Sequence, residues 1–186
     1  MKNRPVAILL ALAALLSGLA GCTAPHMVDV NKRILAFAVG IDAGDEPGTV
    51  PLSLQFFAVS PGDQESATGK RVPIVKTVTA PSVGAGWTQL KNQLPGTMYK
   101  GTVELVVLGE ELARSGVRTV MDDLLRHPLL PVNLDVAVTR GTAHQFLTQE
   151  VREREGPAVF AVDMLAGPGK RSLDLWRMLD GALNSW

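Results

Sequence analysis

Carboxylates and histidines are the side chains of this sequence that could transfer a proton or bind a metal ion. Glu110 and Glu111 form an adjacent acidic pair of the kind used in acid–base chemistry. At the start of a predicted helix, however, two carboxylates also complement the positive end of the helix dipole. Asp42, Asp45 and Glu46 form an acidic stretch whose spacing differs from that of a calcium-binding loop. Both groups therefore favour local structural roles.

The remaining polar residues give no stronger signal. No two of the three histidines have the spacing of metal ligands: His26, His127 and His144. The serines at positions 60, 66, 82 and 115 lack the context of a nucleophile elbow. Residues 167–172 resemble a phosphate-binding loop, but Lys170 is followed by Arg171 instead of Ser or Thr. The sequence therefore predicts no catalytic residue, no metal site and no cofactor, and hence a protein that is not an enzyme.

Cys22 carries the strongest chemical signal, and it is the only cysteine in the 186 residues. Lys2 and Arg4 precede an apolar run at residues 6–16, which is shorter than the roughly 20 residues that span a bilayer. Small residues follow, ending in Leu-Ala-Gly-Cys, an order that resembles the bacterial lipoprotein box. We therefore expect a lipoprotein signal peptide over residues 1–21 and a diacylglyceryl group on the Cys22 sulfur, which anchors the chain to membrane lipid. The alternative is an ordinary signal peptide or membrane helix with a chance cysteine.

Composition limits the fold and its partners. With 46% hydrophobic residues and mixed charges, the chain is ordinary for a globular protein, and its length fits one domain. Removal of residues 1–21 leaves 16 basic and 18 acidic residues, a formal charge of −2, without a basic stripe. Binding to nucleic acid is therefore not expected. A single cysteine also excludes an internal disulfide and a cysteine-rich zinc site.

Residues 103–140 show the clearest pattern of secondary structure. An apolar run at 103–108 predicts a buried strand, and Gly109 ends it. From Glu110 to residue 126 the pattern is that of an amphipathic helix, with apolar residues at Val117, Val120, Met121, Leu124 and Leu125. Residues 132–138 alternate between apolar and polar side chains, which is strand period. A crossover of this length returns the chain parallel to its first strand, so we expect the two strands to lie parallel with the helix packed on them.

The rest of the chain adds elements around this unit. A tether is predicted at residues 22–33. Three further strands are predicted at 34–41, 52–59 and 74–79. We expect the first of these strands to be central in the sheet and to form a hairpin with the second. Helices are predicted at 82–94, with Ser82 as N-cap, and from Thr142, which has capping-box spacing with Gln145 and buries Ala143, Phe146 and Leu147. Residues 158–165 fit a strand or a helix, and 172–186 fit a helix. These elements predict an α/β fold, with α+β as the alternative, in which helices flank a mixed sheet. We expect a single domain over residues 34–186, or one that ends near residue 155.

Four stretches, in order along the chain, also carry a resemblance to a known family. They are the lipoprotein box ending at Cys22, residues 38–42 (AVGID), residues 54–61 (LQFFAVSP), and residues 106–113 (VVLGEELA) with the helix and the VAVTRG stretch that follow. They resemble the Ger(x)C family, the lipoprotein C subunits of bacterial spore germinant receptors. The likeness covers residues 34–150, the family's N-terminal domain. The chain departs from the family pattern at residues 23–26, where a Trp-Asp-Arg-like segment is usual.

The resemblance implies a non-enzymatic subunit anchored to the outer face of the spore inner membrane. Such a subunit would act in spore germination through contacts with the germinant receptor A and B membrane subunits, in response to nutrients. The alternative from another class is a lipid-anchored extracytoplasmic protein that binds a small ligand. That alternative predicts a ligand-sized pocket with convergent polar groups.

Overall fold

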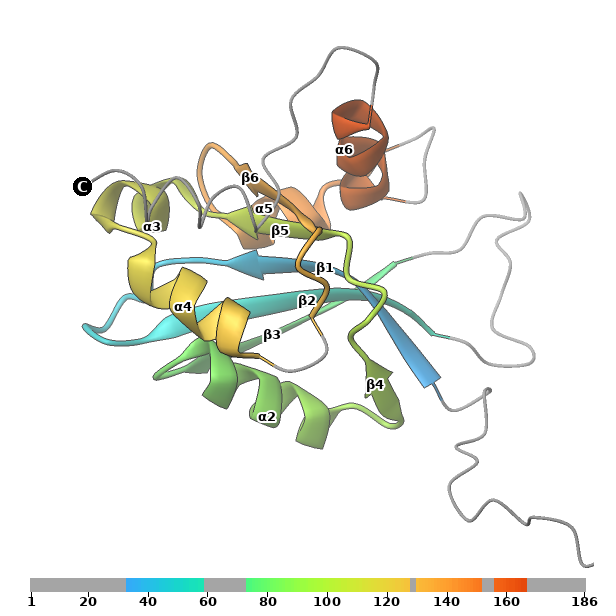
Figure 1. Ribbon diagram of the computed structural model, residues 1–186, viewed down its shortest axis with the longest axis horizontal. Coiled ribbons are helices and arrows are strands. Elements are labelled where there is room, and N and C mark those ends of the chain that lie inside the picture. The colour runs from blue at the N-terminus through green and yellow to red at the C-terminus, as the bar shows by residue number, and fades with distance from the viewer. Residues whose placement is uncertain (1–32, 59–72, 128–129, 152–155, 167–186) are drawn as a thin grey trace, which may run out of the picture.

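The structure is a computed structural model that describes residues 33–58, 73–127, 130–151 and 156–166. Within these ranges six strands form one mixed sheet and five helices cover it (Figure 1). The strands are β1 (Arg33–Ile41), β2 (Val50–Ala58), β3 (Ile74–Ala80), β4 (Thr97–Tyr99), β5 (Leu105–Leu108) and β6 (Asp135–Val138). The helices are α2 (Val83–Gln93), α3 (Glu110–Ser115), α4 (Arg118–Arg126), α5 (Ala143–Thr148) and α6 (Pro157–Leu165). The predicted α/β fold, a mixed sheet flanked by helices, is confirmed.

The strand order is β3-β2-β1-β5-β6, and β4 pairs with the first residues of β1. β1 and β2 are antiparallel neighbours, and β3 adds antiparallel to β2. On the other side, β5 is parallel to β1 and β6 is parallel to β5. The predictions of a central first strand, of its hairpin with the second, and of two parallel strands around residues 110–126 are therefore confirmed.

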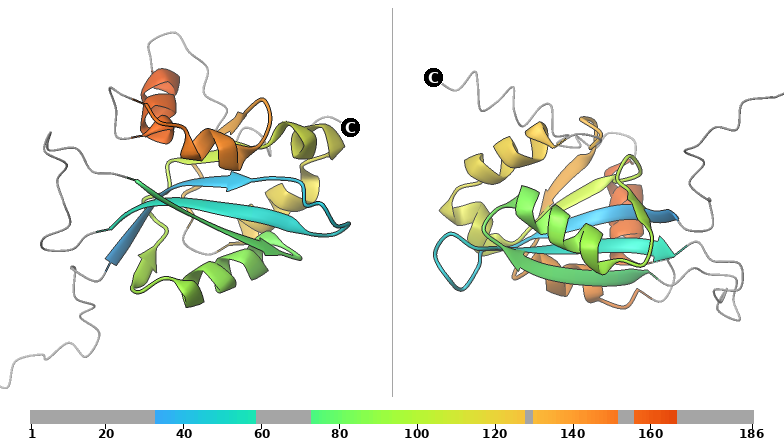
Figure 2. Two further views of the ribbon diagram at one scale, coloured as in Figure 1. Left: turned by 180° about the vertical axis from the view of Figure 1, so that it is seen from behind. Right: turned by 90° about the horizontal axis from the view of Figure 1, so that it is seen from below.

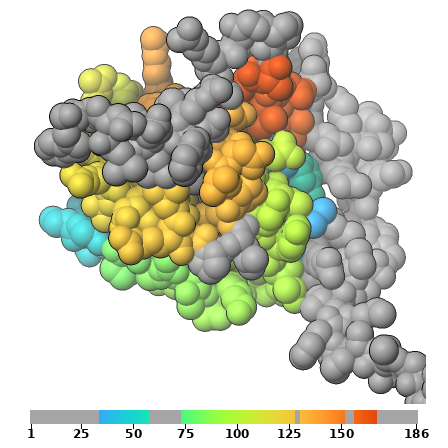
Figure 3. Space-filling model, viewed as in Figure 1, coloured from blue at the N-terminus to red at the C-terminus, as the bar shows by residue number. Residues whose placement is uncertain are grey.

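Helices cover both faces of the sheet (Figure 2). On one face α2, α3 and α4 bury Trp87, Leu112 and Leu124 against alternate residues of the strands. The side chains of α4 and α2 lie next to each other on this face, as Figure 3 shows. On the other face α5 and α6 bury Leu147 and Ala158. β1 is apolar in both alternating sets because it contributes to both cores.

α2 is held at its N-terminus by two side chains. Ser82 is the N-cap, as predicted, and its Oγ accepts a hydrogen bond from Ala85 N at 3.2 Å. Asp123 of α4 contributes the second, because its Oδ2 accepts a hydrogen bond from Val83 N at 3.1 Å. This second contact ties α4 to α2 beside their shared apolar core.

The prediction of a single helix from Glu110 to residue 126 was wrong. The helix is divided into α3 and α4, and Gly116 between them has a φ of +113°. Residues with a side chain rarely adopt this backbone φ, so a glycine ends α3 here. Gly116 N donates a hydrogen bond to Leu112 O. The spacing of apolar residues continues into α4, which is why the pattern concealed the break.

Other differences concern short or exposed elements. Of the strand predicted at 132–138, only Asp135–Val138 forms a strand, which is β6. Leu134 and Val136 are buried, whereas Val132 and Val138 are both 59% exposed. β4 was not predicted, because three residues with one half-buried side chain, Met98, carry no period. Residues 158–165, left open between strand and helix, belong to α6.

The helix predicted from Thr142 is confirmed as α5, with both hydrogen bonds of the capping box between Thr142 and Gln145. Ala143 and Leu147 are buried as predicted, whereas Phe146 is only half-buried. The predictions for the signal peptide and for residues 172–186 lie outside the described residues.

Candidate functional site

The carboxyl ends of the parallel strands β1, β5 and β6 meet at one edge of the sheet, and Asp42 lies there directly after β1. Its side chain is buried, and its two oxygens accept hydrogen bonds from the N-terminus of α5. Oδ1 accepts from Ala143 N at 2.6 Å, and Oδ2 accepts from His144 N at 3.0 Å. A carboxylate is favourable at this position because the first amide groups of a helix lack acceptors within the helix.

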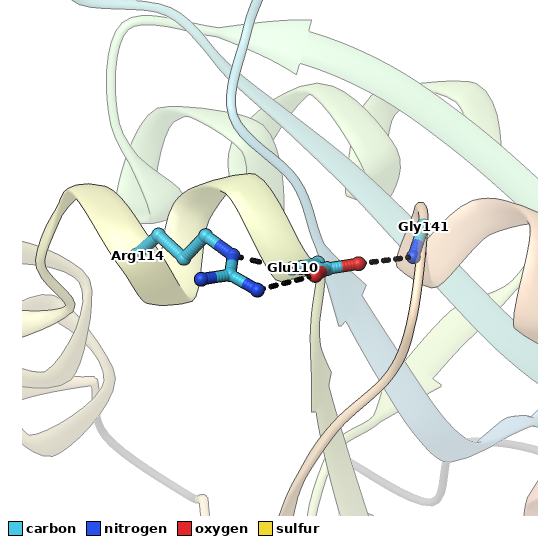
Figure 4. A network of polar contacts seen from close by, with 3 residues as sticks. All are labelled: Glu110, Arg114 and Gly141. Carbon is cyan, nitrogen blue, oxygen red and sulfur yellow. Dashed lines mark hydrogen bonds and ion pairs between the residues drawn. The ribbon is translucent and has the colours of Figure 1, made fainter.

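Glu110 makes the corresponding link from the end of β5 (Figure 4). Its Oε1 accepts hydrogen bonds from Arg114, at 2.8 Å from Nη2 and 3.3 Å from Nε, and its Oε2 accepts one from Gly141 N at 3.2 Å. Glu110 N in turn donates to Gly141 O at 2.9 Å. Arg114 first, and Gly141 second, hold the pKa of Glu110 below its usual range. The carboxylate therefore joins α3 to the loop that follows β6.

Two glycines allow α5 and the Asp42 side chain to lie close to the strands at this edge of the sheet. A Cβ at Gly109 would collide with Asp42 Oδ1, and a Cβ at Gly40 would lie 2.9 Å from Leu147 Cδ1 and 3.0 Å from Ala143 Cβ. Both positions need glycine because α5 and the Asp42 carboxylate approach the strands closely. We call Gly40, Asp42, Gly109, Glu110 and Gly141 the motif junction. They come from two of the four stretches that carry the family resemblance: AVGID, and VVLGEELA with the VAVTRG that follows it.

The motif junction accounts for the acids that the sequence made candidates for chemistry. Each oxygen of Asp42 and of Glu110 accepts at least one hydrogen bond from a backbone amide or from Arg114. Asp45 and Glu46 are exposed in the β1–β2 turn, where Thr49 Oγ1 donates to Glu46 O at 2.7 Å. In the described part of the chain, no three His, Cys, Asp or Glu side chains lie together as metal ligands.

The other candidates are dispersed. His144 and Glu111 are exposed, and His144 uses its backbone amide on Asp42. Ser115 Oγ donates to Leu112 O at the end of α3. The remaining candidates lie outside the described residues: Cys22, His26, Ser60, Ser66 and residues 167–172.

A second polar group, which the sequence did not predict, lies between α2, α4 and the loop after β4. Lys100 Nζ is 3.0 Å from His127 Nε2 and 4.8 Å from the centroid of the Trp87 ring. The rings of Trp87 and His127 are 5.4 Å apart. Desolvation first, and the charge of Lys91 second, lower the pKa of Lys100. No sequence pattern could join these residues, because they come from three separate segments.

The comparisons with known proteins agree with each other. The chain matches the family model described as the spore germination protein N-terminal domain over residues 26–180. It is 28% identical over 97 residues to a candidate spore germination protein, YfkR, of Bacillus subtilis (strain 168). That alignment covers 52% of this chain and 25% of YfkR. No solved structure matches the chain. Within the ranges that the structure describes, no helix has the length and hydropathy needed to cross a membrane.

Proposed function

Because the chain belongs to the spore germination protein N-terminal domain family, we propose that it is a lipid-anchored, non-enzymatic subunit of a nutrient germinant receptor. Membership in the family supports a role in spore germination, and the similarity to YfkR agrees with that role. In this proposal the chain lies on the outer face of the spore inner membrane and contacts the A and B membrane subunits of the receptor.

The observation that carries the non-enzymatic part of the proposal is the motif junction. The acids in the stretches typical of the family, Asp42 and Glu110, bind backbone amides that would otherwise lack partners. A general acid must reach the substrate atom that it protonates, and a general base must reach the substrate proton that it removes. A nucleophile needs a neighbouring base. These carboxylates instead hold α3 and α5 on the sheet, so the motif supports a rigid shape suited to contact with a partner.

The anchor part of the proposal rests on Cys22 and the apolar run before it. Two acyl chains give a stable membrane anchor, since each buried methylene contributes about 0.8 kcal/mol. An anchored domain is confined to the membrane plane, which raises its effective concentration near membrane partners. Contact with such partners then needs only modest intrinsic affinity.

A pull-down from detergent-solubilised spore membranes tests this function. We expect an affinity-tagged chain carrying its lipid to retrieve A and B receptor subunits, identified by mass spectrometry. The Cys22→Ala chain, expressed at the same level, is the matched control and should retrieve much less. Recovery of the lipidated chain without either subunit would contradict the receptor role, and a bound small molecule in its place would favour the ligand-binding alternative.

A further inference from the structure

Gln55 is a polar side chain in β2 that is 0% exposed. Its neighbours Leu54 and Phe56 point into the core under α2 and α4, so Gln55 points to the face that α5 and α6 cover. Ser53, which is also buried on that face, has a partner, because its Oγ lies 2.9 Å from Thr77 Oγ1. Neither Nε2 nor Oε1 of Gln55 has a hydrogen-bond partner in the described part of the chain. A buried carboxamide without a partner destabilises a folded protein, so this side chain calls for one.

The first turn of α6 has a similar deficiency. Gly156 is the N-cap and has no side chain that could accept a hydrogen bond, and Pro157 follows at the first helical position. The next residue, Ala158, has an amide hydrogen but no acceptor for it within the helix. Ala158 is 0% exposed, so solvent at the protein surface does not reach this amide. The N-terminus of α6 therefore buries a backbone donor that no cap side chain satisfies.

The N-terminus of α5, on the same face of the sheet, shows how such a donor is normally satisfied. Ala143 is also 0% exposed, and its amide donates to Asp42 Oδ1 at 2.6 Å. The N-cap Thr142 accepts a further hydrogen bond from Gln145 N through its Oγ1. In α5 two side chains therefore supply acceptors to the first turn, whereas the N-cap of α6 supplies none.

Gln55 and the N-terminus of α6 lie against each other. A Cβ at Gly156 would lie 3.0 Å from Gln55 Nε2 and 2.9 Å from Pro73 Cγ. Gly156 also has a φ of +113°, which residues with a side chain rarely adopt. The Gln55 carboxamide therefore ends beside the N-cap of α6, in the turn that contains the Ala158 amide. Two sets of buried polar groups that need partners meet at this point.

A water molecule has the chemistry that both groups require. It can accept two hydrogen bonds and donate two, and internal water molecules typically bind about three otherwise unpaired polar groups. An ion is disfavoured, because burying a charge beside neutral groups is costly. We propose that an internal water molecule binds between Gln55 and the first turn of α6, where it accepts hydrogen bonds from Ala158 N and Gln55 Nε2. A half-turn of the carboxamide brings Oε1 to the same water as an acceptor, so either orientation keeps the contact.

This water site attaches the N-terminus of α6 to β2. It also gives a role to the polar residue of the stretch LQFFAVSP, residues 54–61, because Gln55 binds the water that caps α6. The site does not depend on the proposed anchor or on receptor contacts, so its test is separate from theirs.

Nuclear magnetic resonance of the isotope-labelled full chain in detergent micelles detects such a water directly. Magnetisation transferred from a bound water gives laboratory-frame and rotating-frame cross peaks of opposite sign, whereas proton exchange gives peaks of the same sign. We expect peaks of opposite sign at the Ala158 amide and at the side-chain amide of Gln55. The Ala158 peak should disappear in Gln55→Met and persist in Gln93→Met, the matched change at an exposed glutamine at the end of α2.

The stability of the same variants gives a second readout, whose sign distinguishes the two possibilities. If Gln55 binds the water, Gln55→Met removes a partner from it, so the urea midpoint should fall and the Ala158 amide should exchange with solvent roughly tenfold faster. If the carboxamide has no partner, its removal relieves a penalty, and the urea midpoint should rise. Gln93→Met should leave the midpoint unchanged.

Three results would overturn the water site. The first is a wild-type chain without peaks of opposite sign at the Ala158 amide, and this result counts even if Gln55→Met does not fold. The second is an Ala158 peak that persists in Gln55→Met, because a nearby hydroxyl proton would then be its source. The third is a urea midpoint that rises in Gln55→Met.

Discussion

Asp42 shows how one side chain can join distant parts of this chain. It follows β1 directly, yet its carboxylate accepts hydrogen bonds from Ala143 N and His144 N, about a hundred residues later. A buried carboxylate that accepts two amide hydrogen bonds contributes more than a neutral acceptor, because charge-assisted hydrogen bonds are stronger. The acidic stretch therefore contains one structural residue and two solvent-exposed ones.

The first prediction concerns this carboxylate. Asp42→Asn keeps the volume but turns one acceptor into a donor that faces a backbone amide. We expect the free energy of unfolding to fall by about 1–3 kcal/mol. Urea denaturation followed by circular dichroism measures the change. Asp45→Asn in the exposed turn is the matched control and should stay within about 0.5 kcal/mol. Equal effects of the two substitutions would contradict the assigned role of Asp42.

The second prediction concerns Glu110 and pH. Its pKa is lowered in the folded chain by Arg114 and Gly141, so the charged form is the one that folding stabilises. That contribution is present above the pKa of the unfolded chain and is lost as pH falls through the lower, folded-state pKa. We expect Glu110→Gln to reduce the urea midpoint at about pH 7 and to match the wild-type chain at about pH 2.

The control for that experiment is Glu111→Gln, one residue along on α3. Glu111 is exposed, so its substitution should change stability by less than about 0.5 kcal/mol at neutral pH. A Glu110→Gln variant whose deficit is the same at both pH values would show that the carboxylate charge is not what matters.

Packing of helices on the sheet gives a prediction for α4. Leu124 is 1% exposed and lies in the core shared by α2, α4 and the sheet. Leu124→Ala removes buried methyl groups and leaves a cavity, which should cost about 2–5 kcal/mol. Thr119→Ala, on the exposed side of the same helix, should cost less than about 0.5 kcal/mol. A small effect at Leu124 would mean that α4 does not pack as described.

The break between α3 and α4 gives another prediction. Gly116 has a φ of +113°, so Gly116→Ala should lower the free energy of unfolding by about 1–3 kcal/mol. Gly84 in α2 is the control, because a Cβ there would meet only Ser82 Oγ at 3.9 Å. Gly84→Ala should be neutral or stabilising by about 0.4–1 kcal/mol. If thermal unfolding ranks the two substitutions in the reverse order, α3 and α4 form one continuous helix.

Elements with a strong period were predictable, and contacts between distant elements were not. β1, β2, α2 and the parallel pair β5–β6 follow from runs of apolar residues and from caps such as Ser82. β4 is too short to carry a period, and the break at Gly116 lies inside an unbroken helical pattern. The pairing of Asp42 with α5 and of Lys100 with His127 depends on tertiary structure, because the partners are separated by many residues. The site was therefore less predictable than the fold.

For the whole domain, the motif junction at the carboxyl end of β1 holds α3 and α5 on the sheet. In the proposed function, a lipid on Cys22 would confine the domain to the membrane plane and raise its effective concentration near membrane partners. This arrangement agrees with a protein that acts through position and contact.

Germination of spores that carry single substitutions tests this claim most directly. The response to nutrients is followed as loss of spore optical density, and the folding of each purified chain is checked by circular dichroism. We expect Cys22→Ala to weaken the response while the domain stays folded, because the chain loses its anchor. Alanine substitutions at His127, His144, Glu110 and Glu111 should each have a much smaller effect. A folded chain in which one of those four substitutions abolishes germination, while Cys22→Ala responds like the wild type, would contradict a role through anchored contact.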